Sequence, residues 1–183
     1  MAVPAAAGTT CHRAEGTGPP VVLIHGVGLD LGMWDAQAAA LGSHYRVIRY
    51  DMIGHGGSAA RAGALALEDF VVQLDGLCRD LGLGRVTLIG FSMGALVAQA
   101  YALAQPERVA RLVVMSGVYD RDGPARAAVR ERWQTASRLG PEALIEAALA
   151  RWFSPEYQAR NPAAVAALRR RLESNDRHGF LAA

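Results

Sequence analysis

The sequence contains few cysteines, no excess of one charge and no long uncharged apolar segment, and each absence argues against a class of protein. Cys11 and Cys78 are the only cysteines; they lie far apart, without the spacing of a metal site or the density of a disulfide scaffold. The 19 basic and 17 acidic residues give a formal charge of +2, and the basic residues are scattered among acids. This balance predicts no nucleic-acid partner and no membrane partner.

Targeting signals are absent as well. Residues 1–8 have neither the basic start nor the long apolar stretch of a signal peptide, and no later segment is long and uncharged enough to span a bilayer. Cys78 falls in an amphipathic pattern, which favours a small buried apolar residue over a nucleophile. We therefore expect a cytoplasmic protein with reduced thiols.

Apolar side chains make up 51% of the 183 residues, which is enough for one core. Short apolar runs alternate with helical patterns along the first part of the chain. The runs cover residues 21–24, 46–50, 86–89 and 112–115, and the helical patterns cover residues 33–41, 67–81 and 93–104. This alternation predicts an α/β fold with a parallel sheet covered by helices, in which the loops after the strands form the site.

The chain changes character after about Gly123, where Ala- and Arg-rich helical segments follow without a further strand candidate. We therefore expect residues 123–183 to be all-helical. The run Arg169-Arg170-Arg171 is interpreted as a solvated helix face without a functional role. The helical segments are broken at Gly140-Pro141, Ser154-Pro155 and Asn161-Pro162.

The turn Gly90-Phe91-Ser92-Met93-Gly94 matches the pattern G-x-S-x-G, and it lies between a predicted strand and a predicted helix. The glycines permit a sharp turn that leaves the Ser92 hydroxyl exposed at the end of the sheet, near the partial positive charge of a helix N-terminus. Ser92 is therefore the candidate nucleophile. The alternative is an ordinary N-terminal helix cap, a position that serine favours.

The loop His25-Gly26-Val27-Gly28 follows the first buried strand and can supply a backbone hydrogen-bond donor. Attack by a serine on a carbonyl creates an oxyanion, which needs two N–H groups to stabilise it. One comes from the residue after the nucleophile, Met93, and we assign the other to Val27. His25 is a candidate general base, but its position before the turn favours a hydrogen bond that braces the loop.

These motifs, together with Asp51 and the segment Gly54-His55-Gly56-Gly57-Ser58, occur in the order found in α/β-hydrolases, which the chain resembles over most of its length. The resemblance implies the α/β-hydrolase fold, with a mostly parallel sheet flanked by helices and a helical lid. It assigns residues 1–122 to the N-terminal part of the core and residues 123–183 to the lid. It also implies that Asp51 and His55 brace a loop and take no part in catalysis.

Within the superfamily, the chain resembles 3-oxoadipate enol-lactonases and related carboxylesterases. The resemblance implies hydrolysis of a small-molecule ester or lactone through an acyl-enzyme on Ser92, without a cofactor or metal. We expect at least one of Trp152 and Phe153 in the core of the lid. The segments similar to lid segments of those enzymes are Arg151-Trp152-Phe153-Ser154-Pro155, Asn161-Pro162 and Asn175-Asp176-Arg177-His178-Gly179-Phe180.

An acid and a histidine follow the nucleophile in this superfamily, on loops after two later strands. After Ser92 the only histidine is His178, and Asp176 is too close to it for the two to come from separate strand ends. We therefore assign neither, and we expect a C-terminally truncated chain that lacks the last core strands and has weak residual turnover at most. The strand at residues 112–115 would then present an uncovered edge, open to self-association or to a complementing chain.

Other functions fit the same scaffold. A non-catalytic relative would only bind an acyl compound or a partner protein. Related families cleave carbon–carbon bonds or act as cofactor-free haloperoxidases.

Overall fold

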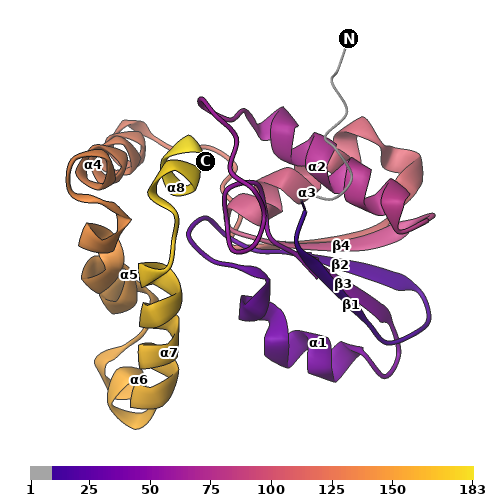
Figure 1. Cartoon of the computed structure of the whole chain (residues 1–183), viewed down its shortest axis with the longest axis horizontal. Coiled ribbons are helices and arrows are strands. Elements are labelled where there is room, and N and C mark those ends of the chain that lie inside the picture. The colour runs from indigo at the N-terminus through magenta and orange to yellow at the C-terminus, as the bar shows by residue number, and fades with distance from the viewer. Residues whose placement is uncertain (1–9) are drawn as a thin grey trace.

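A five-stranded sheet forms the centre of the chain in a computed structural model, which describes residues 10–183 (Figure 1). The strand order is β1-β3-β2-β4-β5; β1 is antiparallel to β3, and every other neighbouring pair is parallel. The α/β fold and the four predicted strands are thus confirmed. The strands are β1 (His12–Glu15), β2 (Pro20–Ile24), β3 (Arg46–Tyr50), β4 (Val86–Phe91) and β5 (Val109–Met115).

Strand β1 was not predicted from the sequence. All of its residues are exposed, so it has no alternating apolar pattern that could be recognised. It forms by pairing with β3, where buried Arg49 donates from Nε to Glu15 Oε1 at 3.0 Å. Pairing with β3, and not an apolar pattern of its own, therefore determines where β1 forms.

Helices cover both faces of the sheet (Figure 1). Val22 and Ile24 of β2 pack in the cluster that includes the side chains of α2 and α3, whereas Val21 and Leu23 pack with Trp34 on the opposite face. Because β2 is buried on both faces, its sequence is an uninterrupted apolar run. The helical elements are η1 (Leu31–Trp34), α1 (Asp35–Leu41), α2 (Leu67–Asp80), α3 (Met93–Ala104) and the short η2 (Pro106–Arg108).

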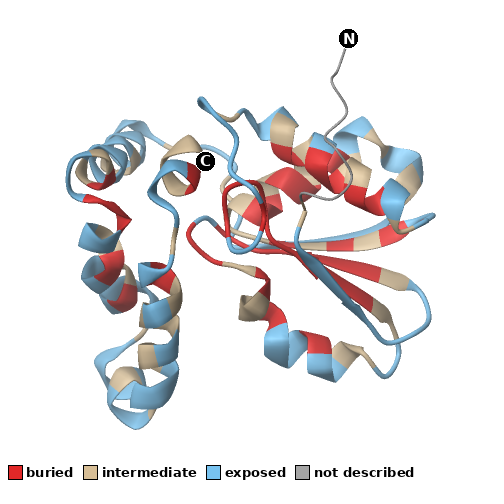
Figure 2. Cartoon of the chain, in the orientation of Figure 1, coloured by how far each residue is buried: buried red, intermediate tan, exposed pale blue. Residues whose placement is uncertain are grey.

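The strand β5 lies at one edge of the sheet and is poorly covered. Its residues Leu112, Val113, Val114 and Met115 are between 38% and 45% exposed, and no strand within residues 10–183 pairs with its outer side. Figure 2 shows buried residues concentrated in the central strands of the sheet. The uncovered apolar edge that the sequence predicted is present.

A column of helices, here called the helical tail, lies beyond the carboxyl ends of the parallel strands (Figure 1). After Met115 the described residues form helices and no strand, as predicted. Phe153 packs against the core of the tail, whereas Trp152 is 38% exposed. The tail comprises α4 (Gly123–Leu139), η3 (Pro141–Leu144), α5 (Ile145–Trp152), α6 (Pro155–Arg160), α7 (Pro162–Glu173) and α8 (Arg177–Ala182).

Membrane-spanning helices were sought in residues 10–183, and none of the helices there has the length and apolar character that a bilayer crossing needs. Both cysteines are free; Cys78 is fully buried in the core, as predicted, and burial raises its pKa to about 11.

The tail contacts the sheet part of the chain through two glycines. Gly179, in the first turn of α8, lies against the backbone of Gly54, so a methyl group at Gly179 would collide with the Gly54 carbonyl oxygen. A methyl group at Gly54 would lie 2.6 Å from Gly179 Cα. Next to this contact, Leu65 N–H donates to the Ala182 carbonyl at 2.9 Å. Glycine is therefore required on both sides where α8 docks.

We expect Gly179→Ala to destabilise the chain by about 1–3 kcal/mol, because the added methyl group forces α8 away from Gly54. Gly76→Ala, in α2 where a methyl group meets nothing within 4 Å, is the control and should stabilise by up to about 1 kcal/mol. Urea unfolding of both variants measures the difference. If both substitutions changed the free energy of unfolding equally, the contact between Gly54 and Gly179 would not require glycine.

Candidate active site

Ser92 connects β4 to α3 in a strained backbone conformation. Its φ is 54° and its ψ is −115°, values that cost a residue with a side chain on the order of 1–3 kcal/mol. The turn is held from the neighbouring strand, because the Ser92 N–H donates to the Met115 carbonyl at 2.9 Å. Strain of this kind is concentrated at functional sites.

The two glycines of the turn are required by close backbone contacts. A side chain at Gly94 would collide with the carbonyl oxygens of Ile24 and His25, and one at Gly90 would collide with the Gly94 carbonyl. The first turn of α3 thus rests directly on the carboxyl end of β2. This explains why the pattern G-x-S-x-G carries glycine at both ends.

The Ser92 side chain does not cap the helix. Its hydroxyl makes no capping hydrogen bond to α3 and has no hydrogen-bond partner within residues 10–183. The positive φ also differs from the extended backbone typical of an N-cap. The alternative interpretation of Ser92 as an ordinary cap is therefore wrong.

The loop of residues 26–32, here called the oxyanion loop, lies beside Ser92. A methyl group on Gly26 would be 3.2 Å from Ser92 Cβ. Residues 26–29 form a turn in which the Leu29 N–H donates to the Gly26 carbonyl at 3.1 Å and Gly28 has a φ of 74°. A positive φ at the third residue alone identifies a type II turn, with Val27 at its second position.

The backbone N–H groups of Val27 and Met93 donate no hydrogen bond within the part of the chain that the structure describes. Met93 is the first residue of α3. The N–H groups in the first turn of a helix have no acceptor within that helix. Val27 is 37% exposed. The fold therefore brings together Ser92, Val27 and Met93, and leaves both predicted donors available.

His25 is fully buried and braces the oxyanion loop, as predicted. Its Nδ1 donates to the Gly26 carbonyl at 2.8 Å, and its Nε2 accepts from the Met52 N–H at 2.9 Å. Burial, assisted by the neighbouring His55, lowers its pKa to about 3. A neutral ring with both nitrogens engaged cannot serve as the general base for Ser92.

Asp51 and the loop after it form a second brace. The Asp51 carboxylate accepts from the N–H groups of Leu31 at 2.7 Å and Gly57 at 2.8 Å, which ties the oxyanion loop to the Asp51 loop. Gln73, which the sequence did not suggest, donates from Nε2 to the Asp51 carbonyl at 3.0 Å. Asp51 is thus a structural residue, in agreement with the prediction.

His55 lies in the same brace and is 1% exposed. Its Nδ1 donates to the Ile53 carbonyl at 3.0 Å, and its ring lies 5.3 Å from that of His25. Burial lowers the pKa of His55 as well. Burial therefore favours the neutral form of both histidines.

Neither His178 nor Asp176 hydrogen-bonds to Ser92. Asp176 caps α8 by accepting from the Gly179 N–H at 2.7 Å. His178 is exposed and lines a groove with residues 60–64 and Trp133. None of the five histidines hydrogen-bonds to Ser92 within residues 10–183. Within that same range, no group of three or more His, Cys, Asp and Glu side chains is arranged to hold a metal.

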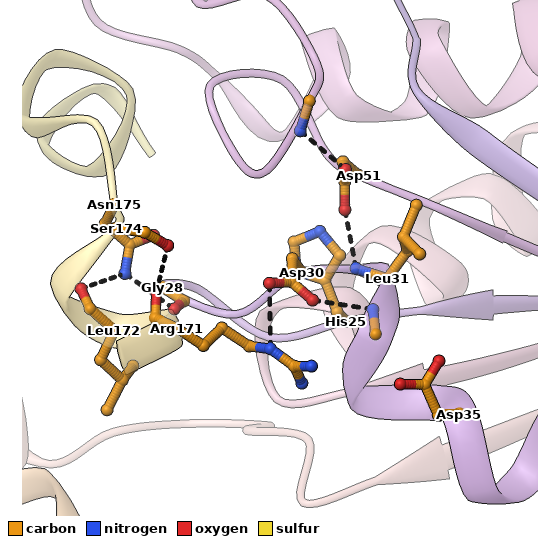
Figure 3. Close-up of polar contacts among 12 residues, drawn as sticks. His25, Gly28, Asp30, Leu31, Asp35, Asp51, Arg171, Leu172, Ser174 and Asn175 are labelled. Carbon is orange, nitrogen blue, oxygen red and sulfur yellow. Dashed lines mark hydrogen bonds and ion pairs between the residues drawn. The ribbon is translucent and has the colours of Figure 1, made fainter. Parts of the chain in front are cut away.

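The interpretation of Arg169-Arg170-Arg171 as a solvated face is wrong for Arg171. Its Nε lies 3.0 Å from Asp30 Oδ2 in the oxyanion loop (Figure 3). Arg169, on the same helix, pairs instead with Glu146 of α5. The sequence contains no signal that separates these two arginines.

The buried histidines should make stability depend on pH. Between pH 6.5 and about 3 the unfolded chain binds a proton at residue 25 that the folded chain does not, so the free energy of unfolding falls as the pH is lowered. The loss is about 1 kcal/mol per pH unit for each such proton.

His25→Asn removes the titrating ring and keeps a possible donor to the Gly26 carbonyl. We expect lower stability at pH 7 but a shallower loss between pH 6.5 and 4, measured by urea unfolding. His12→Asn, which removes an exposed histidine, is the control. If the free energy of unfolding of His25→Asn fell with decreasing pH as steeply as that of the parent, the assignment of a buried neutral histidine would be contradicted.

The chain is similar to known hydrolases. The chain is 41% identical over 145 residues to an (E)-2-((N-methylformamido)methylene)succinate hydrolase from Acinetobacter baylyi, a match that covers 79% of this chain and 54% of that protein. It is 28% identical over 166 residues to 3-oxoadipate enol-lactonase 2 from the same organism, which covers 88% of this chain and 60% of that protein. The chain thus spans little more than half the length of these relatives.

A solved structure of an enol-lactonase from Burkholderia xenovorans LB400 matches with a TM-score of 0.88 at 33% identity, over 94% of this chain and 67% of that one. The pattern that defines the alpha/beta hydrolase fold matches residues 19–169, which include the oxyanion loop, the Asp51 loop and the turn around Ser92. The resemblance inferred from the motifs is confirmed. The chain belongs to the α/β-hydrolase fold family.

Proposed function

We propose that the chain carries the nucleophile and the oxyanion hole of a serine hydrolase that acts on a carboxylic ester or lactone. The observation that carries this proposal is the strained turn at Ser92, beside a loop whose Val27 N–H has no hydrogen-bond partner within residues 10–183. A hydroxyl without a capping role and two unsatisfied N–H groups are the parts that acyl transfer needs. The helical tail would act as the lid over this site.

The proposed reaction has two steps. The Ser92 Oγ attacks the carbonyl carbon and its proton passes to a base, while the N–H groups of Val27 and Met93 stabilise the oxyanion. Collapse of the tetrahedral intermediate expels the alcohol or enol, which takes up the proton, and leaves an ester on Ser92. Water then attacks this acyl-enzyme, which releases the carboxylic acid and restores the hydroxyl.

The base is the part that the described residues do not supply. His25 and His55 are buried and hydrogen-bond to backbone carbonyls, and the exposed His178 lines a groove with residues 60–64 and Trp133. We propose that a histidine from polypeptide outside these 183 residues accepts the proton. Without it, an oxyanion hole still gives roughly 10³–10⁴-fold acceleration over water.

Two observations support the proposed substrate class: the names of similar proteins, and the contacts between the helical tail and the turn around Ser92. The names of the two Acinetobacter proteins include a succinate and an oxoadipate, which favours a small ester or lactone that carries a carboxylate. Phe91 of the nucleophile turn packs against Leu29 and the tail residues Ile145 and Leu149. We therefore propose an apolar acyl pocket between this turn and the tail.

An alkyl fluorophosphonate should label the chain slowly and at Ser92 alone, and Ser92→Ala should abolish the label.

Val27→Pro removes one oxyanion donor, and the second position of a type II turn accepts proline. It should slow labelling by about 10²–10³-fold. Val27→Ala keeps the N–H and should label at the parental rate; intact mass and peptide mapping give the rates and the position.

Free imidazole should accelerate labelling of the parent, because it can serve as the absent base. Absence of any label on the folded chain, with and without imidazole, would refute an activated Ser92. Equal rates for Val27→Pro and Val27→Ala would remove Val27 from the oxyanion hole.

The exposed edge of β5 supports a second proposal, that the isolated chain self-associates through this edge. Val113 is 42% exposed and lies in an edge strand, where unpaired backbone groups invite pairing with another strand. Val113→Lys should shift the chain towards the monomer in light scattering across a concentration series. Leu103→Lys, at an 85% exposed position on α3, is the control and should leave association unchanged. A parent chain that is monomeric at every concentration would contradict the proposal.

A further inference from the structure

The oxyanion loop is held from two sides, and Val27 lies between the two sets of contacts. On the side of the sheet, His25 Nδ1 donates to the Gly26 carbonyl and Asp51 accepts from the Leu31 N–H. Val27 itself makes no backbone hydrogen bond within residues 10–183. The orientation of its peptide group therefore depends on how its neighbours in the loop are fixed.

The helical tail supplies a hydrogen bond directly after Val27. Asn175, between α7 and α8, donates from Nδ2 to the Gly28 carbonyl at 2.9 Å, although 147 positions separate the two residues (Figure 3). The same Nδ2 donates to the Leu172 carbonyl at 2.9 Å, which fixes the amide against the end of α7. Its two hydrogens are thus shared between the tail and the oxyanion loop.

An ion pair extends this contact. Arg171 Nε lies 3.0 Å from Asp30 Oδ2, and both side chains are little more than a quarter exposed. The other oxygen of the carboxylate, Oδ1, accepts from the Gly32 N–H at 2.7 Å and caps η1. The Arg171 guanidinium lies over Gly32, where a methyl group would be 2.6 Å from Nη2. One carboxylate therefore joins the tail to the last part of the loop.

Apolar contacts join the same two segments. Leu29 is 7% exposed and packs with the tail residues Ile145, Leu149 and Leu172. The Phe180 ring of α8 covers Gly28, where a methyl group would be 3.1 Å from Cε2. Three consecutive residues of the loop, from Gly28 to Asp30, thus each contact the tail.

We propose that Asn175 and Arg171 are positioning residues that fix the oxyanion loop, so that docking of the helical tail orients the Val27 N–H towards the oxygen on the reacting carbon. The inference rests on the proposed serine hydrolase function and adds a role for the tail beyond covering the substrate. Neither side chain needs to touch the substrate. Their effect passes through the carbonyl of Gly28 and the carboxylate of Asp30.

The test compares Asn175→Ala, Arg171→Ala and the isosteric Asp30→Asn with the parent chain. An alkyl fluorophosphonate is the probe, and its rate constant for reaction (kinact) and its binding constant (KI) are measured separately. We expect kinact to fall about tenfold in each variant, less than the 10²–10³-fold expected for removal of a donor, with KI unchanged. Arg169→Ala, on the same helix but paired with Glu146, is the control and should match the parent. Arg171→Lys keeps the charge and should restore part of the rate.

Backbone amide NMR gives a second readout that does not need a reactive serine. In Asn175→Ala and Asp30→Asn the Val27 signal should shift and its hydrogen exchange should quicken, whereas the Met93 signal should stay in place. If the parent is not labelled but these changes occur, the hydrolase proposal fails and the positioning role stands. An unmoved Val27 signal, or a rise in KI at constant kinact, would overturn the positioning role. Asp30→Asn keeps the shape of the side chain, so this variant is expected to fold like the parent.

Discussion

Contact between the backbone at the start of α3 and the carboxyl end of β2 is the constraint on which the site depends. Gly94 lies against the carbonyl groups of Ile24 and His25, at a separation that no side chain would permit. Because the two segments touch, Ser92 lies next to Gly26 and the oxyanion loop. The unfavourable φ of Ser92 persists because the buried sheet on one side and α3 on the other hold the turn.

Buried polar groups then fix the loops around Ser92. His25, Asp51 and Gln73 each hydrogen-bond to backbone groups of loops that follow a strand. Such side chains are stable in the interior because their polar atoms are satisfied, and burial keeps His25 neutral. Residues that resemble a catalytic histidine and acid in the sequence are thus parts of the scaffold, and no described residue hydrogen-bonds to the Ser92 hydroxyl or the Val27 N–H.

The parts of the site that the sequence predicted are those encoded in short segments. The turn around Ser92 combines glycines, a serine, a preceding apolar strand and a following helix within about a dozen residues, so its conformation could be inferred without the rest of the chain. The bracing role of His25 was inferred from its position before a turn, whereas that of Asp51 was implied by the resemblance to α/β-hydrolases. Strand β1 could not be found in this way, since its polar residues are ordered only by pairing with β3. The link between Asn175 and Gly28 joins distant segments and leaves no local pattern.

A structure of the chain with an alkyl phosphonate bound covalently to Ser92 would test the oxyanion hole most directly. The tetrahedral phosphorus imitates the carbon of the intermediate, and its non-bridging oxygen imitates the oxyanion. We expect this oxygen to lie within hydrogen-bond distance, about 2.7–3.1 Å, of the backbone nitrogens of both Val27 and Met93. A phosphonyl oxygen that points away from these two nitrogens would contradict it, as would an adduct on any residue other than Ser92.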